Sequence, residues 1–112
     1  MQTFAEFWPF YLREHRKPAT RALHYVGTTC VLLAVAAAIV ARRPALLLFA
    51  PLAGYGFAWV SHFFIEGNKP ATFKYPRWSF LADFKMYGMA VSGRLGPELQ
   101  RAGVADGVPG AA

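Results

Sequence analysis

The sequence predicts an all-α membrane protein, in which a transmembrane helical hairpin has an amphipathic interfacial helix before it and another after it. The main observation is a pair of apolar stretches without charged residues, at about residues 22–41 and 44–65. Each is long enough to cross a bilayer as a helix, because about 20 residues span the hydrocarbon core. Only Arg42 and Arg43 separate the two stretches, so the spans must turn back on each other.

The composition supports a lipid environment. Of 112 residues, 55% are hydrophobic and only 16% are charged, which is more apolar surface than one small soluble core can bury. The net charge is +6, and the basic residues flank the apolar spans, so we expect anionic lipid headgroups as partners and no nucleic acid. We expect one domain over residues 1–95 and a disordered tail over 96–112, where glycine, alanine and proline are frequent.

The interfacial helices precede and follow the hairpin. Residues 3–15 have aromatic side chains at helical spacing, and Thr3 with Glu6 has the spacing of a capping box. Residues 16–21 form a basic turn in which Pro18 ends or redirects the helix. The second span contains Gly54 and Gly56, which allow close helix packing. A third main helix over residues 77–95 has uncharged pieces too short to cross the bilayer, so it lies at the interface or packs against the hairpin.

Charge predicts the topology. Basic residues are more frequent before the first span and after the second than in the loop between them. The positive-inside rule therefore places both termini in the cytoplasm. The N-terminus has no basic region followed by a short apolar run and a cleavage site, so we expect the first span to act as an uncleaved insertion signal. The expected location is a bacterial inner membrane.

Three histidines converge at one face of the predicted membrane domain. His24 opens the first span and His62 closes the second, and a hairpin brings these two ends together. His15 lies just upstream, and Glu66 follows His62 by four residues on the same helical face. Ionisable residues at membrane spans are costly and commonly functional. An interfacial histidine can also simply extend towards the headgroups, so the pattern alone leaves a non-functional cluster open.

Imidazoles with a carboxylate are suited to iron(II), zinc or manganese, and an open site of two histidines and one carboxylate suits iron and oxygen chemistry. Asp83 would either bind the metal or hold a ligating histidine in its tautomer. Other functions remain open: a non-catalytic scaffold or partner-binding protein, a haem protein with His24 and His62 as axial ligands, or a zinc-dependent lipid hydrolase. The sequence has neither a phosphate-binding glycine loop nor a nucleophile elbow.

Three segments resemble the Mpo-type family of small membrane proteins, whose characterised fungal member is an iron(II)-dependent 2-hydroxy fatty acid dioxygenase. The most specific is the H-x3-E-x3-P-A element that begins at His62, behind Trp59. The others are residues 10–27, with both upstream histidines, and residues 76–86. The resemblance covers roughly residues 4–95. The family often has asparagine where this chain has Thr20.

The resemblance implies that a 2-hydroxy fatty acid is oxidised with O₂ and shortened by one carbon, with Fe(II) as the cofactor. His15, His24 and His62 would bind the metal, and Glu66 would be a fourth ligand or an orienting group. Asp83 and Thr20 would contact the ligands from outside. The substrate carboxylate would be attracted by basic residues at the same face, namely Arg16, Lys17, Arg21 and Lys69. The oligomeric state is not predicted.

Overall fold

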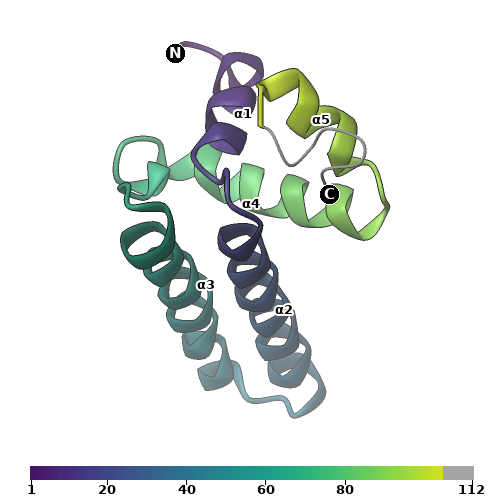
Figure 1. Cartoon of the computed structure of the whole chain (residues 1–112). Coiled ribbons are helices and arrows are strands. Elements are labelled where there is room, and N and C mark those ends of the chain that lie inside the picture. Colours follow the sequence, from purple (N-terminus) through teal and green to yellow (C-terminus); the bar gives the residue numbers. More distant parts are fainter. Residues whose placement is uncertain (105–112) are drawn as a thin grey trace.

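The computed structural model describes residues 1–104, which contain helices and loops and no strand. The two long helical segments form a hairpin, and three shorter helices gather at one end of it (Figure 1). We call these three helices, α1, α4 and α5, the headpiece. The elements in order are α1 Phe4–Arg13, α2 Pro18–Val40, η1 Pro44–Leu48, α3 Phe49–Val60, η2 Ser61–Glu66, η3 Ala71–Phe73, α4 Pro76–Val91 and α5 Leu95–Ala102.

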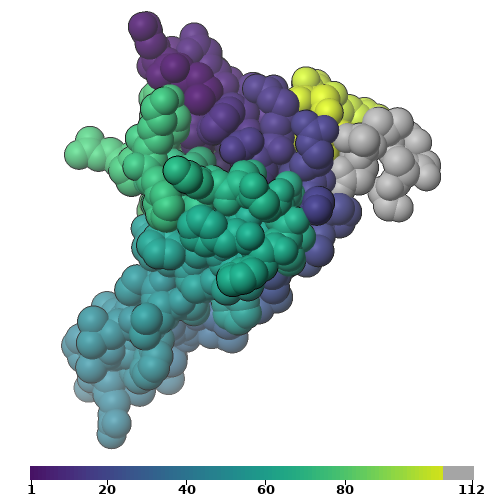
Figure 2. Space-filling view, turned by 60° about the vertical axis from the view of Figure 1, so that its left-hand side comes forward, coloured from purple at the N-terminus to yellow at the C-terminus, as the bar shows by residue number. Residues whose placement is uncertain are grey.

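The hairpin confirms the predicted fold class. Its two arms, Pro18–Val40 and Pro44–Glu66, each have 23 residues and are apolar enough to cross a membrane. A helix of this length extends about 35 Å, enough for the hydrocarbon core. Large apolar side chains point outward from both arms, as in Val40 (83% exposed) and Phe64 (82% exposed). Figure 2 shows the hairpin tapering away from the wider headpiece.

The first span begins earlier than the sequence predicts. Helix α2 starts at Pro18, so residues 18–21 are helical and do not form part of a basic turn. Proline suits the first position of a helix because its missing N–H would have no partner there, and its fixed φ angle is helical. The consequence is that Thr20 and Arg21 lie on the same helix as His24.

Small residues set the contact between the two arms. A Cβ atom on Gly27 would lie 3.2 Å from the carbonyl oxygen of Ala53 and 3.3 Å from the Cβ of Phe57, so the helices approach closely there. A Cβ on Gly54 would lie 3.1 Å from Cγ2 of Val31, which confirms the predicted role of Gly54. Gly56 has no such neighbour within 4 Å, so its predicted role in close packing is wrong.

The headpiece encloses the hydrophobic core. The aromatic face of α1 is buried against α4 and α5, with Phe7, Tyr11 and Leu12 each at most 1% exposed. The predicted N-terminal cap is confirmed, since Thr3 Oγ1 accepts a hydrogen bond of 3.2 Å from the N–H of Glu6. Helix α4 packs against α2, so the headpiece covers the end of the hairpin where the histidines lie.

The structure corrects the disorder expected for residues 96–104. Helix α5 begins at Leu95, and Leu99 and Ala102 are buried in the headpiece core. The indole Nε1–H of Trp8 donates to Glu98 Oε1 at 3.0 Å, which ties α5 to α1. The glycine-rich composition concealed an apolar stripe at helical spacing, which burial against α1 stabilises. The rest of the expected tail, residues 105–112, lies outside the described residues.

Candidate metal centre

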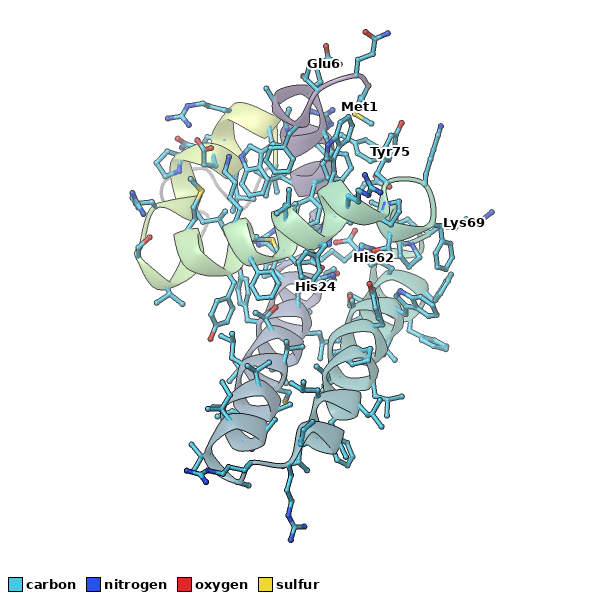
Figure 3. The ribbon with its side chains drawn as sticks, turned by 180° about the vertical axis from the view of Figure 1, so that it is seen from behind. Met1, Glu6, His24, His62, Lys69 and Tyr75 are labelled. Atoms are coloured by element: carbon cyan, nitrogen blue, oxygen red, sulfur yellow. The ribbon has the colours of Figure 1, made fainter. Side chains whose placement is uncertain are left out.

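The three histidines come together where the headpiece meets the hairpin. His15 lies in the turn between α1 and α2, His24 on the first turns of α2, and His62 in η2 at the end of the second span. Their exposed fractions are 1%, 6% and 2%, so all three are buried. Figure 3 shows His24 and His62 beneath α4, at the adjoining ends of the two spans. This confirms the convergence that the hairpin predicts, and we call the group the histidine triad.

The ring nitrogens of the triad have two separate sets of partners. His15 Nε2 lies 3.0 Å from His24 Nε2 and 3.1 Å from His62 Nε2. Each Nδ1 faces an oxygen instead. His15 Nδ1 is 2.6 Å from the carbonyl of Tyr11, His24 Nδ1 is 2.9 Å from the carbonyl of Thr20, and His62 Nδ1 is 2.7 Å from Oδ1 of Asn68.

These contacts fix the tautomers. A carbonyl oxygen only accepts hydrogen bonds, so each Nδ1 must carry the proton. The orientation of the Asn68 amide is set in the same way, because its Nδ2 donates to the carbonyl of Glu14 at 3.1 Å. In the neutral rings, the three Nε2 lone pairs therefore point at one another. Such an arrangement is repulsive unless a cation lies between the nitrogens.

A metal ion fits this arrangement better than a proton. Burial, together with the neighbouring His24 and His62, holds the pKa of His15 well below its ordinary value, so the ring resists a second proton. Nitrogens that bind one ion at about 2.0–2.1 Å lie roughly 2.8–3.4 Å apart, from octahedral to tetrahedral geometry, and the two separations from His15 Nε2 fall within this range. The triad can therefore hold a metal ion through three Nε2 atoms.

A π-helical turn carries His62 and the residue that supports its ring. Residues Ser61–Glu66 form η2, a π-helix, and Gly67 ends it in the left-handed conformation at φ 74°. Glycine adopts this conformation without steric cost. The N–H of Asn68 then bonds to the carbonyl of His62 at 2.9 Å, which turns the chain back and places the Asn68 amide on the ring of His62. π-Helices of this kind occur frequently at functional sites.

The triad borders a cavity of ≈ 10 Å³, whose lining also includes Tyr11, Ser79 and Asp83. This is about the space that a single water molecule or ion needs. A larger cavity of ≈ 270 Å³ adjoins it and shares the side chains of His24 and Asp83. The site is thus a small polar chamber beside a larger apolar space.

Comparison with known families agrees with this geometry. Residues 1–95 match the family described as 2-hydroxy-palmitic acid dioxygenase Mpo1-like. The chain belongs to the Mpo1-like family. No curated protein and no solved structure matches the chain. The family description suggests a dioxygenase acting on a 2-hydroxy fatty acid, and the buried triad supplies a group that can bind a metal.

Glu66 lies apart from the triad in this Mpo1-like chain. The carboxylate accepts a hydrogen bond from the backbone N–H of Lys17, and the ammonium of Lys17 donates to the carbonyl of Ile65 at 2.9 Å. Lys17 is the residue that precedes α2, so Glu66 places a negative charge at the N-terminus of that helix. The structure therefore brings Glu66 to the junction of the two spans, and among residues 1–104 the group that could hold a metal ion consists of the three histidines.

The four basic residues expected to attract a carboxylate differ in their environment. Arg21 is buried, and its Nη1 donates to the carbonyls of His15 and Arg16 at 2.7 and 2.9 Å. It thereby fixes the turn that carries His15. Arg16, Lys17 and Lys69 are exposed, and Figure 3 shows Lys69 extending outward beside the loop that follows His62.

Asp83 lines the wall of the chamber, and Thr20 contacts His24 from behind it. The Tyr11 hydroxyl donates to Asp83 Oδ1, and burial raises the pKa of Asp83 to about 6, although this hydrogen bond acts in the opposite direction. Asp83 lines the cavity without contacting an Nδ1 atom of the triad, all of which bond elsewhere. Thr20 orients His24 through its backbone carbonyl, and its buried hydroxyl has no hydrogen-bond partner.

Two residues in these roles were not predicted. They are Asn68, whose amide supports the ring of His62, and Tyr11, whose hydroxyl donates to Asp83. The signal for Asn68 was the Gly-Asn pair after the second span, which favours a left-handed turn that brings the chain back. Nothing in the sequence pairs Tyr11 with Asp83, because 72 residues separate them.

Proposed function

We propose that this protein is an iron(II)-dependent membrane dioxygenase that oxidises 2-hydroxy fatty acids with O₂ and shortens them by one carbon. The observation that carries the proposal is the convergence of three Nε2 lone pairs at 3.0 and 3.1 Å in a buried chamber. Three imidazoles leave coordination positions open for a substrate, as non-haem iron oxygenases require. The family description gives further support for the substrate class.

The protein's own residues would hold and orient the reactants. His15, His24 and His62 would bind the iron, and the acceptors on their Nδ1 atoms fix the direction of each ring. When bound, iron(II) supplies Lewis acidity and the electrons that an O₂-dependent oxidation requires. Asp83, whose pKa lies at about 6, would hold or accept a proton at the chamber wall.

The surface around the chamber suits an anionic amphiphile at a membrane. Arg16, Lys17 and Lys69 are exposed at the same end of the hairpin and would attract the carboxylate before it binds. The two arms of the hairpin would anchor the protein in the bilayer, with the headpiece and both termini on the cytoplasmic side of a bacterial inner membrane. The hydroxy acid would then enter from the lipid phase.

A turnover assay tests the proposed function. Purified protein reconstituted with iron(II) is incubated with 2-hydroxy fatty acids in detergent, with and without O₂, and the products are identified by mass spectrometry. We expect O₂-dependent formation of products one carbon shorter, abolished by substituting His62→Ala. Activity that persists without O₂ would indicate a zinc-type hydrolase, for which three histidines are also a suitable ligand set. Absence of any turnover at full iron occupancy would refute the proposal.

The haem alternative receives no support from the geometry. Two axial nitrogens at about 2.0 Å from a central iron must face each other across a flat porphyrin. The triad instead gathers three nitrogens within 4.8 Å of one another, beside a cavity of ≈ 10 Å³. This chamber has room for an ion and not for a macrocycle.

A further inference from the structure

The larger cavity is a groove between the hairpin and the headpiece. It has a volume of ≈ 270 Å³ and lies between α2, α3 and α4. Most of its lining is apolar, and four of its five polar side chains also line the metal chamber. The lining includes Thr28, Val31, Pro51, Gly54, Phe80 and Phe84, and four residues belong to both spaces: His24, Tyr55, Thr72 and Asp83.

The groove runs from the histidine triad towards the middle of the membrane. On α2 its lining residues are His24, Thr28 and Val31, which lie on one helical face at spacings of four and three. Seven residues of helix correspond to about 10 Å along the axis, about a third of the hydrocarbon core. The groove therefore has a polar head end at the triad and an apolar far end at Val31 and Pro51.

At the far end of the groove, Val31 lies against the opposite helix. The Cγ2 atom of Val31 would be 3.1 Å from a Cβ on Gly54, so a side chain at position 54 would crowd the valine. Beyond this contact, η1 packs against α2. Val31 thus forms part of the end wall of the groove, where a larger side chain would occupy space that is now open.

We propose that this groove binds the alkyl tail of the hydroxy acid and that Val31 determines how much of the tail it accepts, an inference that rests on the proposed function. The polarity of the groove matches an amphiphile whose head lies at the triad and whose tail points to the bilayer centre. Two of its three walls, α2 and α3, belong to the membrane spans, so the tail can enter from the bilayer without crossing water. An alkyl chain is the occupant that this lining suits, since a polar ligand would leave its groups unpaired there.

The test compares Val31→Phe with Leu33→Phe. Leu33 lies two residues further along α2 and is 63% exposed, so the control adds the same bulk outside the groove. In an iron-loaded protein we expect Val31→Phe to lower the ratio of kcat/KM for long over short 2-hydroxy acids by about tenfold or more, the range for a few methylenes in an apolar pocket. Leu33→Phe leaves this ratio unchanged. A ratio unaltered by Val31→Phe overturns the inference while the proposed function stands.

Photolabelling provides a second measurement that needs no turnover. A 2-hydroxy fatty acid with a mid-chain diazirine is cross-linked to the metal-free wild-type protein, and labelled peptides are mapped. We expect labels at Val31, Pro51 and Gly54, in competition with unlabelled acid. Labels confined to lipid-facing positions such as Leu33 and Leu52 overturn the inference. Labels in the groove, combined with no turnover of hydroxy acid by the iron-loaded protein at full occupancy, support the groove and refute the proposed function.

Discussion

Asn68 is expected to control metal affinity although it does not touch the metal. Its Oδ1 accepts from His62 Nδ1 at 2.7 Å, and its Nδ2 donates to the carbonyl of Glu14 at 3.1 Å. The amide therefore ties the ring of His62 to the end of α1. Substituting Asn68→Ala removes both bonds and frees the ring to rotate, or to move its proton to Nε2, where it would block the ligand atom.

The expected decrease in metal affinity follows from the removal of the acceptor on His62 Nδ1. Removing such an outer partner typically lowers metal affinity by about 10–100-fold, which corresponds to about 1.4–2.7 kcal/mol. Asn68→Asp keeps an acceptor for Nδ1 and loses only the donor to Glu14, so it should restore most of the affinity. Gln100→Ala removes an exposed amide from α5 and serves as the matched control.

The assay is an anaerobic titration of iron(II) against a competing chelator, with circular dichroism to verify helical content. The account predicts a weakened Asn68→Ala protein, near-wild-type affinity for Asn68→Asp, and no change for Gln100→Ala. Iron affinity within twofold of wild type in a folded Asn68→Ala protein would refute the reasoning, because it would show that His62 needs no external partner.

Three further predictions concern the chamber wall, the N-terminus of α2 and the headpiece core. The pKa of Asp83 is raised from 3.8 to about 6, so its protonated form stabilises the fold at low pH, and this contribution is lost as the pH rises through 6. As the pH rises from 4 to 7, the melting temperature of Asp83→Asn should therefore rise relative to that of the wild type. A constant difference between the two melting temperatures over this range would contradict the prediction. Glu66→Gln should keep an iron affinity within twofold of wild type. It should lose about 0.5–1 kcal/mol of stability in thermal unfolding, because a negative charge is removed from the N-terminus of α2. Loss of iron from this variant would show that Glu66 is a ligand. Leu99→Ala should lower the free energy of unfolding by about 2–5 kcal/mol and should speed hydrogen exchange at the backbone amides of α5. Unchanged protection of these amides would show that α5 does not depend on the contacts of Leu99.

The sequence predicts the fold well where hydrophobicity decides it. The two spans follow from uninterrupted apolar runs, and their adjacency follows from the short link at Arg42 and Arg43. The meeting of His24 and His62 is then a geometric consequence. Gly27 shows where this reasoning stops, because the close approach of the arms depends on which helical faces meet, and hydropathy does not specify that.

The details of the site depended on local backbone geometry. In an α-helix Glu66 shares a face with His62, which is why both were predicted as ligands. The π-helical turn of η2 changes that register, and the left-handed Gly67 returns the chain so that Asn68 contacts His62. Glu66 is left beside Lys17. The Gly-Asn pair indicates a turn, but a sequence window does not distinguish a π-helix from an α-helix, so the contact of Asn68 with His62 is visible only in the structure.

The central claim is that the histidine triad holds a metal ion, and metal content tests it most directly. The protein is purified without oxygen in detergent, reconstituted with iron(II), and analysed by inductively coupled plasma mass spectrometry beside a variant with His15, His24 and His62 replaced by alanine. The account predicts about one metal ion per chain in the wild type and none in the folded variant. Equal metal content in both proteins, or no metal in either, would contradict it.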